Sequence, residues 1–184
     1  MDSKQDYTNL GIAINNYGKY VIQQSKSNLT KNKKGGGDLY NSLKYKAINN
    51  KKVGNPYTLE FFMENYGAFV DKGVKGVNST YPETRAAQSK FQYGSGTGPK
   101  GGLTKGIDNW LKKKNFRWRD ELGRFMTFKS MRYLIVQKIY FQGIKAIMFF
   151  SRPLELGEKK YSKEIVDGFV KDIDIKITFP KETE

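Results

Sequence analysis

The chain has 184 residues, of which 38% are hydrophobic and 14% aromatic, so it is long enough for one compact domain with polar excursions. It contains no cysteine and no histidine, which excludes disulfides, thiol nucleophiles, most zinc sites and catalytic groups that rely on histidine. Lysine and arginine outnumber aspartate and glutamate by 33 to 18, and the resulting charge of +15 predicts attraction to a polyanion, either nucleic acid or an acidic protein face.

The N-terminal half is predicted to contain one long helix and two strands. Residues 7–30 form an amphipathic helix in this reading, and the lysines and glycines of 31–38 end it. After one helical turn, a strand is predicted through 45–48, and turn residues lead to an alternating strand over 57–64. Residues 66–74 are predicted to form a further strand or a bend. The apolar stripe of the first helix comprises Leu10, Ile14, Tyr17, Val21, Ser25 and Leu29.

The C-terminal half is predicted to be mainly helical after a long polar segment. Residues 75–102 are rich in glycine and show no period, which predicts a long loop. Helices are predicted over 103–115 and 129–143, and Pro153 suits the first turn of another helix. Isoleucines alternate with polar residues over 172–179, which predicts a closing strand. The chain shows neither a signal-peptide pattern nor an apolar run near the roughly 20 residues of a membrane helix.

Three aspartates are candidates for acid–base or metal chemistry. Asp71 has no second carboxylate or base nearby in the sequence, so ion pairing or turn capping is favoured. Asp172 and Asp174 share one face of the predicted closing strand, where alternation with isoleucine explains them as its solvent face. A nuclease that uses these three carboxylates is the enzymatic alternative. We expect no catalytic residue, no metal ion and no cofactor.

A run of basic residues after the polar segment is the strongest polyanion candidate. It interleaves with four aromatic residues, Phe116, Trp118, Phe125 and Phe128. Such interleaving suits phosphate neutralisation with stacking on nucleic acid. It also suits a protein–protein seam, which is favoured because no recognisable nucleic-acid motif accompanies the run. For the net charge itself, a basic surface kept for solubility is the alternative reading. The run comprises Lys112, Lys113, Lys114, Arg117, Trp118, Arg119, Arg124, Lys129 and Arg132.

Three short motifs stand in a fixed order along the chain. The first is Gly-x-Leu-x-x-Ser, the second is Tyr-Gly-x-Phe-Val-Asp-x-Gly, and the third is Phe-x-x-Pro. In that order they comprise Gly37, Leu39 and Ser42; then Tyr66, Gly67, Phe69, Asp71 and Gly73; then Phe150 and Pro153. Together they resemble the tail-completion or head–tail joining proteins of tailed bacteriophages. The block over residues 103–143 is similar to an insertion in crAss-like phages.

The resemblance implies an α+β fold in which a long N-terminal helix and C-terminal helices pack on a mainly antiparallel sheet with long loop insertions. It implies a single domain over 1–184, with the 75–102 loop and the 103–143 helical insertion. It further implies a structural virion protein, assembled in the host bacterial cytoplasm, that forms an oligomeric ring in the phage neck. The portal and other neck or tail proteins would be its partners, and DNA would pass through the ring. A stand-alone basic nucleic-acid-binding protein is the alternative.

The Tyr-Gly motif carries local expectations. Gly67 would let the backbone pass close beneath a neighbour because glycine has no Cβ. In a strand, Phe69 and Val70 would face opposite sides. Gly73 and Gly76 would allow positive φ in the turn that follows. The motif is therefore expected to position a strand and a loop.

Overall fold

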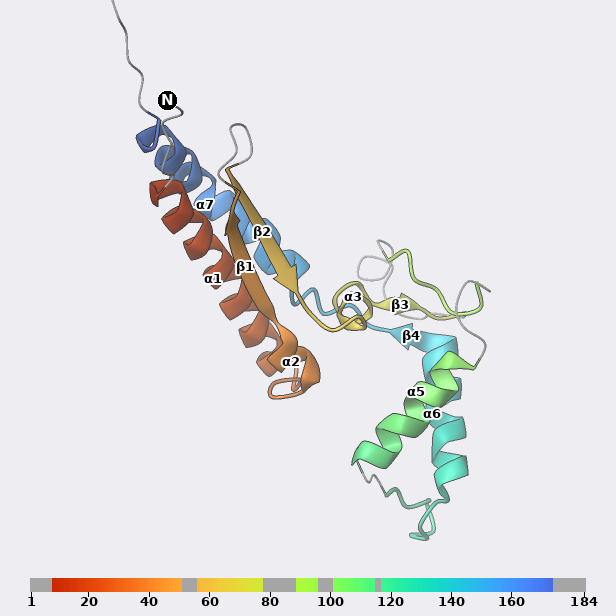
Figure 1. Cartoon of the computed structure of the whole chain (residues 1–184). Helices are drawn as coiled ribbons and strands as arrows, with labels where there is room; N and C mark the ends of the chain where they lie inside the picture. The colour runs from red at the N-terminus through yellow and green to blue at the C-terminus, as the bar shows by residue number, and fades with distance from the viewer. Residues whose placement is uncertain (1–7, 51–55, 78–88, 96–100, 115–116, 174–184) are drawn as a thin grey trace, which may run out of the picture. The chain divides into compact units, whose positions relative to one another are not determined.

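The computed structural model shows an α+β fold with a long N-terminal helix, C-terminal helices and two small antiparallel sheets, as predicted (Figure 1). The described residues form two compact units. Unit 1 comprises 1–65 and 149–184, and unit 2 comprises 66–148. The prediction of a single domain stays a prediction, since each unit is described by itself. The structure describes residues 8–50, 56–77, 89–95, 101–114 and 117–173.

Two antiparallel helices pack against each other in unit 1. Helix α1 spans Thr8–Lys31 and helix α7 spans Ser151–Lys171, and they lie side by side in Figure 1. Glycines of α7 allow the close approach, because Gly157 lies against the Tyr17 ring and Gly168 lies against the first turn of α1. The helix predicted over 7–30 is confirmed. The buried side chains of α1 are Leu10, Ala13, Val21, Ile22, Ser25 and Leu29.

A β-hairpin covers α1. The single turn α2 (Asp38–Ser42) leads into strand β1 (Lys44–Asn49). Each of the six residues of β1 pairs with one residue of the antiparallel strand β2 (Tyr57–Phe62). The Tyr45 ring packs directly on Gly18 of α1, where a Cβ would clash with it. Both predicted strands are therefore confirmed, and the Gly18 that weakens α1 as a helix makes room for the sheet.

The predicted closing strand is wrong at its start. Helix α7 continues to Lys171, and Asp172 serves as its C-cap. The Asp172 carboxylate accepts hydrogen bonds from the backbone N–H groups of Asn9 at 3.1 Å and Leu10 at 2.8 Å. A carboxylate at the start of α1 complements the positive end of that helix, so Asp172 is held by unit 1 rather than by a strand. The remainder of the predicted strand, 174–179, lies outside the described residues.

Unit 2 begins with the Tyr-Gly motif, for which a strand or a bend is predicted, and the strand is wrong. Residues Gly67–Lys72 form the short helix α3, so Phe69 and Val70 do not alternate across a sheet. Apolar runs of this length do not distinguish helix from strand. The helix is fixed by backbone N–H groups from far along the chain: Ile147 donates to the Val70 carbonyl, and Met148 donates to the Asp71 carbonyl.

Two glycines shape the turn after α3. Gly73 has φ +72°, as predicted, and ends α3. The prediction for Gly76 is wrong, because its φ is not positive. Its backbone instead lies so close to Phe141 and Gly143 that a Cβ would clash. Strand β3 (Val74–Lys75) lies between Gly73 and Gly76 and pairs antiparallel with β4 (Gly143–Ile144).

Part of the predicted 75–102 loop is paired with β3. Lys75 donates its N–H to the Phe91 carbonyl, and its carbonyl accepts from Tyr93, both at 2.9 Å. These bonds make a parallel bridge between Lys75 and Gln92. Residues 78–88 and 96–100 of the predicted loop lie outside the described residues.

Two further helices extend from this small sheet. Helix α5 (Gly102–Lys114) and helix α6 (Phe128–Gln142) lie side by side, and residues 117–127 join them at the end far from β3 and β4 (Figure 1). Both predicted helices are confirmed. We call α5, the connection described from Arg117 and α6 the arm. No helix among the described residues is long and apolar enough to cross a membrane.

Candidate nucleic-acid interface

The tip of the arm is a short antiparallel ribbon. Arg119 bridges to Phe125, the Asp120 N–H donates to the Arg124 carbonyl, and the Met126 N–H donates to the Trp118 carbonyl, both at 2.9 Å. The turn between the two sides contains Gly123 at φ +77°, a conformation that glycine adopts without steric cost.

The carboxylate of Asp120 organises this turn. One oxygen accepts from the backbone N–H groups of Leu122 at 3.0 Å and Arg124 at 2.8 Å. The other pairs with the Arg124 side chain at 3.0 Å. Arg119 donates to the Gly123 carbonyl, and its guanidinium lies 4.2 Å from the centroid of the Phe125 ring. The ribbon is thus ordered by its own side chains and keeps its cations at the surface.

The structure brings the basic run predicted from the sequence to this ribbon and the adjoining helix ends. Lys112, Lys113 and Lys114 form the exposed last turn of α5, and Arg117 is exposed where the description resumes. Lys129 lies in the first turn of α6. Exposed aromatic side chains surround these cations: Trp110, Trp118, Phe125 and Phe128. Phe116, which belonged to the same hypothesis, lies outside the described residues.

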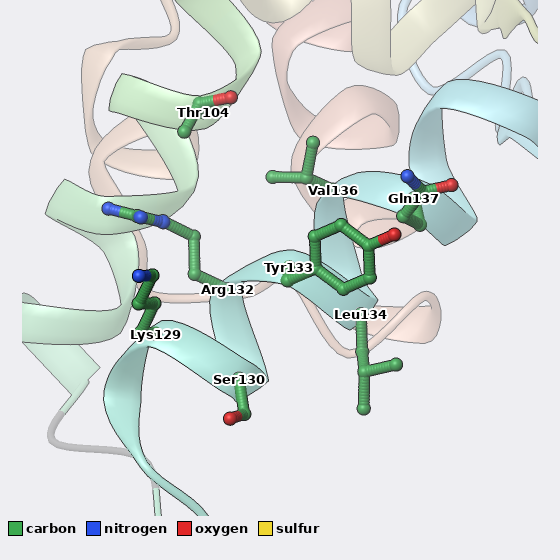
Figure 2. Close-up of a pocket in the computed structure, with 8 residues that line it drawn as sticks. All are labelled: Thr104, Lys129, Ser130, Arg132, Tyr133, Leu134, Val136 and Gln137. Carbon is green, nitrogen blue, oxygen red and sulfur yellow. The ribbon is translucent and has the colours of Figure 1, made fainter.

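Arg132 is the member of the run with a structural partner on the other helix. Its guanidinium pairs with Asp108 of α5 at 3.0 Å. Figure 2 shows Arg132 reaching from α6 toward α5, with Lys129 beside it on the same side. This ion pair joins positions 24 residues apart, so no local pattern in the sequence could have revealed it.

The two basic side chains border an open hollow of about 540 Å³ (Figure 2). Thr104 of α5 and seven residues of α6 line it, among them Ser130, Tyr133 and Gln137. None of the lining residues is an acid. The lining therefore offers hydrogen bonds and positive charge but no acid–base pair.

The first phage-like motif has a role in the fold of unit 1. Gly37 is the N-cap of α2, and Leu39 is buried. The Ser42 hydroxyl donates to the Leu39 carbonyl at 3.0 Å and accepts the Glu64 N–H at 3.1 Å, so it ties the start of β1 to the end of β2.

The second motif shapes unit 2. Tyr66 is the N-cap of α3 and Gly67 is its buried first residue. The Phe69 ring is partly exposed and meets the Phe91 ring edge-on at 4.5 Å. The Gly73 carbonyl accepts the buried Ser89 hydroxyl at 2.7 Å, so the motif joins α3 to the segment that pairs with β3.

The third motif begins α7. Phe150 is the N-cap of this helix, and its ring meets the Phe61 ring of β2 at 5.4 Å. Pro153 is buried in the first helical turn, as predicted. A proline is tolerated there because no intrahelical carbonyl awaits its missing N–H.

The three candidate carboxylates form no acidic cluster that the structure describes. Asp71 is buried in α3 of unit 2, with 3% of its surface exposed. Both oxygens of Asp172, in unit 1, accept hydrogen bonds from the first turn of α1. Asp174 lies outside the described residues. Among the residues that are described, no group of three or more acids is placed to hold a metal ion.

The comparisons with known proteins leave the chain without a matched relative. No protein-family model matches it, and neither a curated protein nor a solved structure is significantly similar to it. Its functional assignment therefore depends on the motifs, the fold and the distribution of charge.

Proposed function

We propose that the protein is a structural virion protein of the phage neck. In this role it forms an oligomeric ring between portal and tail, through which DNA passes, and it performs no reaction. The observation that carries the proposal is the architecture of unit 1. A long N-terminal helix packs on an antiparallel hairpin, and a C-terminal helix begins at Phe150 and Pro153. This is the arrangement that the phage-like motifs imply.

An exposed apolar stripe on α7 and the residues just after it supports assembly. Val166 and Val170 are 59% and 61% exposed, and Phe169 and Ile173 are 38% and 37% exposed. Their spacing of three and four residues puts them on one face. Contiguous apolar surface of this kind is typical of protein–protein contact, and a neighbouring subunit of the ring would cover it.

Native mass spectrometry of the protein, alone and mixed with the portal and neck proteins of the same phage, tests the proposal. We expect a defined oligomer or a complex with those partners. A chain that stays monomeric in every mixture, together with mature particles that lack it at the head–tail junction, would contradict the proposal.

A pair of variants locates the subunit contact. Val166→Asp with Val170→Asp places charge in the α7 stripe, and we expect loss of the oligomer because the charges would have to be desolvated. The matched control is Leu122→Asp, which charges an apolar side chain that is 76% exposed in the arm. Equal loss of assembly in both variants would argue against α7 as the contact.

The charge distribution favours one second candidate, a stand-alone nucleic-acid-binding protein. The net charge of +15 gives the chain affinity for polyanions whether or not it assembles. Salt-sensitive DNA binding by a protein that remains monomeric with every neck partner would select this alternative.

A further inference from the structure

The arm carries a disproportionate share of the positive charge. Residues 102–142 contain ten lysines and arginines but three acids, an excess of seven, whereas the whole chain has an excess of fifteen. These 41 residues therefore supply nearly half of the net charge from under a quarter of the 184 residues. Such local excess is the electrostatic footprint of a polyanion site rather than of a uniformly soluble surface.

Two of the three acids in the arm are already paired with arginines. Asp108 holds Arg132, and Asp120 holds Arg124 and the turn of the ribbon. Apart from the two paired arginines, the arm contains eight cationic residues and one other acid, Glu121. All eight cationic residues are exposed, so the surplus charge lies at the surface of the arm.

Helix stability explains only part of this charge. Lysines in the last turn of α5 complement the negative end of that helix. Lys129 sits in the first turn of α6, at the positive end, where a cation is locally unfavourable and where no acid accompanies it. Arg117 and Arg119 belong to no helix. Six of the eight cations thus lie at the tip or in the helix turns next to it, whereas Lys105 and Lys138 lie toward the other ends of α5 and α6.

The tip is a two-stranded ribbon, an element that a groove of duplex DNA can admit. A major groove about 12 Å wide admits a two-stranded ribbon, and phosphates flank it on both sides. The ribbon from Arg117 to Met126 is preformed by its bridge and by the Asp120 turn. Lysines 112–114 stand beside one side of its base, and Lys129 stands beside the other. Three consecutive lysines on a helix point about 100° apart, so they present charge in several directions at once.

We propose that the arm binds duplex DNA without sequence specificity, with the ribbon at the groove and Lys112, Lys113, Lys114 and Lys129 on the flanking phosphates. Arg119 and Arg124 are engaged inside the ribbon, which leaves them as charges rather than as readers of base edges. The exposed Trp118 and Phe125 side chains supply flat apolar contact beside the backbone. This binding does not require that the chain form a neck ring.

Fluorescence anisotropy with the full chain and a labelled duplex of about 20 base pairs, between about 50 and 200 mM NaCl, tests the proposal. The arm variant is the triple change Lys112→Gln, Lys113→Gln, Lys114→Gln. The matched control is Lys31→Gln, Lys33→Gln, Lys34→Gln, which removes the same charge from exposed lysines of unit 1. Circular dichroism verifies that both variants fold.

The arm variant should bind at least about tenfold more weakly at 100 mM NaCl. The slope of log affinity against log salt concentration should become shallower by about 2 to 3, since each lost phosphate contact removes about 0.9. The control should stay within about twofold of the unaltered protein. Glu121→Gln should act in the opposite sense and tighten binding, because it removes the one acid near the ribbon without an arginine partner in the arm.

Four results would overturn the proposal. The first is no binding to duplex at about 50 mM NaCl. The second is equal weakening by the arm and control variants, which would assign binding to net charge alone. The third is unchanged DNA binding by the arm variant with loss of its complexes with neck proteins, which would make the arm a protein-docking element. The fourth is tighter binding to a single strand of the same length, which would exclude the groove. These readouts stay interpretable if the chain proves to be monomeric.

Discussion

Helix α1 of unit 1 and the two helices of the arm differ in how much of each helix is buried. Helix α1 buries eight of its 24 residues, whereas α5 buries Leu111 alone of its 13 and α6 buries Met131 alone of its 15. Burial of apolar side chains is the main source of stability in proteins. Helix α1 therefore buries its apolar stripe within unit 1, whereas α7 leaves Val166 and Val170 exposed. The two helices of the arm leave most of their apolar side chains in contact with solvent.

The glycines show the same difference. In unit 1, Gly18, Gly157 and Gly168 each lie where a neighbouring ring or backbone approaches closely. In the arm, Gly106 and Gly123 have no atom within 4 Å of where a Cβ would stand. One helix pair uses glycine to pack tightly, whereas the other tolerates it in open space. This contrast indicates that unit 1 is the scaffold and that the arm is an element built to meet a partner.

The largest expected effect is in the part of unit 2 that anchors the arm. In Gly73→Ala the new Cβ would lie 2.5 Å from the Ile144 carbonyl oxygen and 2.7 Å from the Ala146 nitrogen, at φ +72°. Neither backbone atom can move without breaking the β3–β4 pair, so we expect a loss of about 3 kcal/mol or more. Hydrogen exchange at Val74 and Ile144 measures it. Gly123→Ala has the same kind of φ in open space and should cost about 1 kcal/mol. Equal losses would show that φ strain, not close approach, governs both sites.

The next effect compares the two helix pairs directly. Gly157→Ala would place a Cβ 2.7 Å from the Tyr17 ring and 3.1 Å from the Tyr20 ring. Both rings also contact the ring of Tyr161, one turn further along α7. We expect a net loss of about 1–2 kcal/mol even after the gain in helix propensity. Gly106→Ala meets nothing and should gain up to about 1 kcal/mol. Urea unfolding of both variants decides the matter, and a stabilising Gly157→Ala would refute the tight packing of unit 1.

A smaller effect concerns the hydrogen bonds between the Asp172 carboxylate and the first turn of α1. Burial alone would raise the pKa of Asp172, but the N–H groups of Leu10 and Asn9 and the Asn9 side chain outweigh it and lower the pKa below 3.8. A lowered native pKa means that the carboxylate stabilises the fold above the unfolded pKa and that this contribution is lost as pH falls through the native pKa.

Asp172→Asn should therefore destabilise unit 1 at pH 7 by about 0.3–1 kcal/mol, because it removes a negative charge from the positive end of α1. The difference from the unaltered protein should begin to shrink near pH 4 and vanish at lower pH. Thermal unfolding against pH measures it, and Asp167→Asn, on the exposed face of the same helix, is the control. A difference that stays constant from pH 7 to pH 3 would show that the charge of Asp172 is not what matters.

The long periodic elements could be predicted from the sequence, because one face of each is repeatedly apolar. The stripe from Leu10 to Leu29 predicted α1 to within one residue at each end. The alternation from residue 57 predicted β2. Residues 67–72 are too few to show a period, and α3 is fixed by donors at Ile147 and Met148, which lie more than 70 positions away. The sequence around residues 67–72 therefore gives no sign of these distant hydrogen-bond donors.

The candidate interface was predictable as a composition but not as a surface. The basic run and its aromatics are visible in the sequence, as is the i, i+4 spacing of Asp120 and Arg124. The pairing of Arg132 with Asp108 depends on how α5 and α6 pack, so the sequence could not show which cations are already neutralised. A binding surface can be assigned only once it is known which cations are paired within the protein.

The smallest expected effect tests how complete the core of unit 1 is. Ser25 lies between Val21 and Leu29 on the buried stripe of α1, and its hydroxyl has no hydrogen-bond partner among the described residues. A buried hydroxyl without a partner is destabilising, so Ser25→Ala should raise the stability of unit 1 by about 1 kcal/mol. Ser42→Ala is the matched control and should lose about as much, since its hydroxyl joins Leu39 to Glu64. Opposite shifts in the urea midpoint are expected. A loss of stability in Ser25→Ala would mean that the Ser25 hydroxyl has a hydrogen-bond partner in solution. The core of unit 1 around Ser25 would then already be fully satisfied.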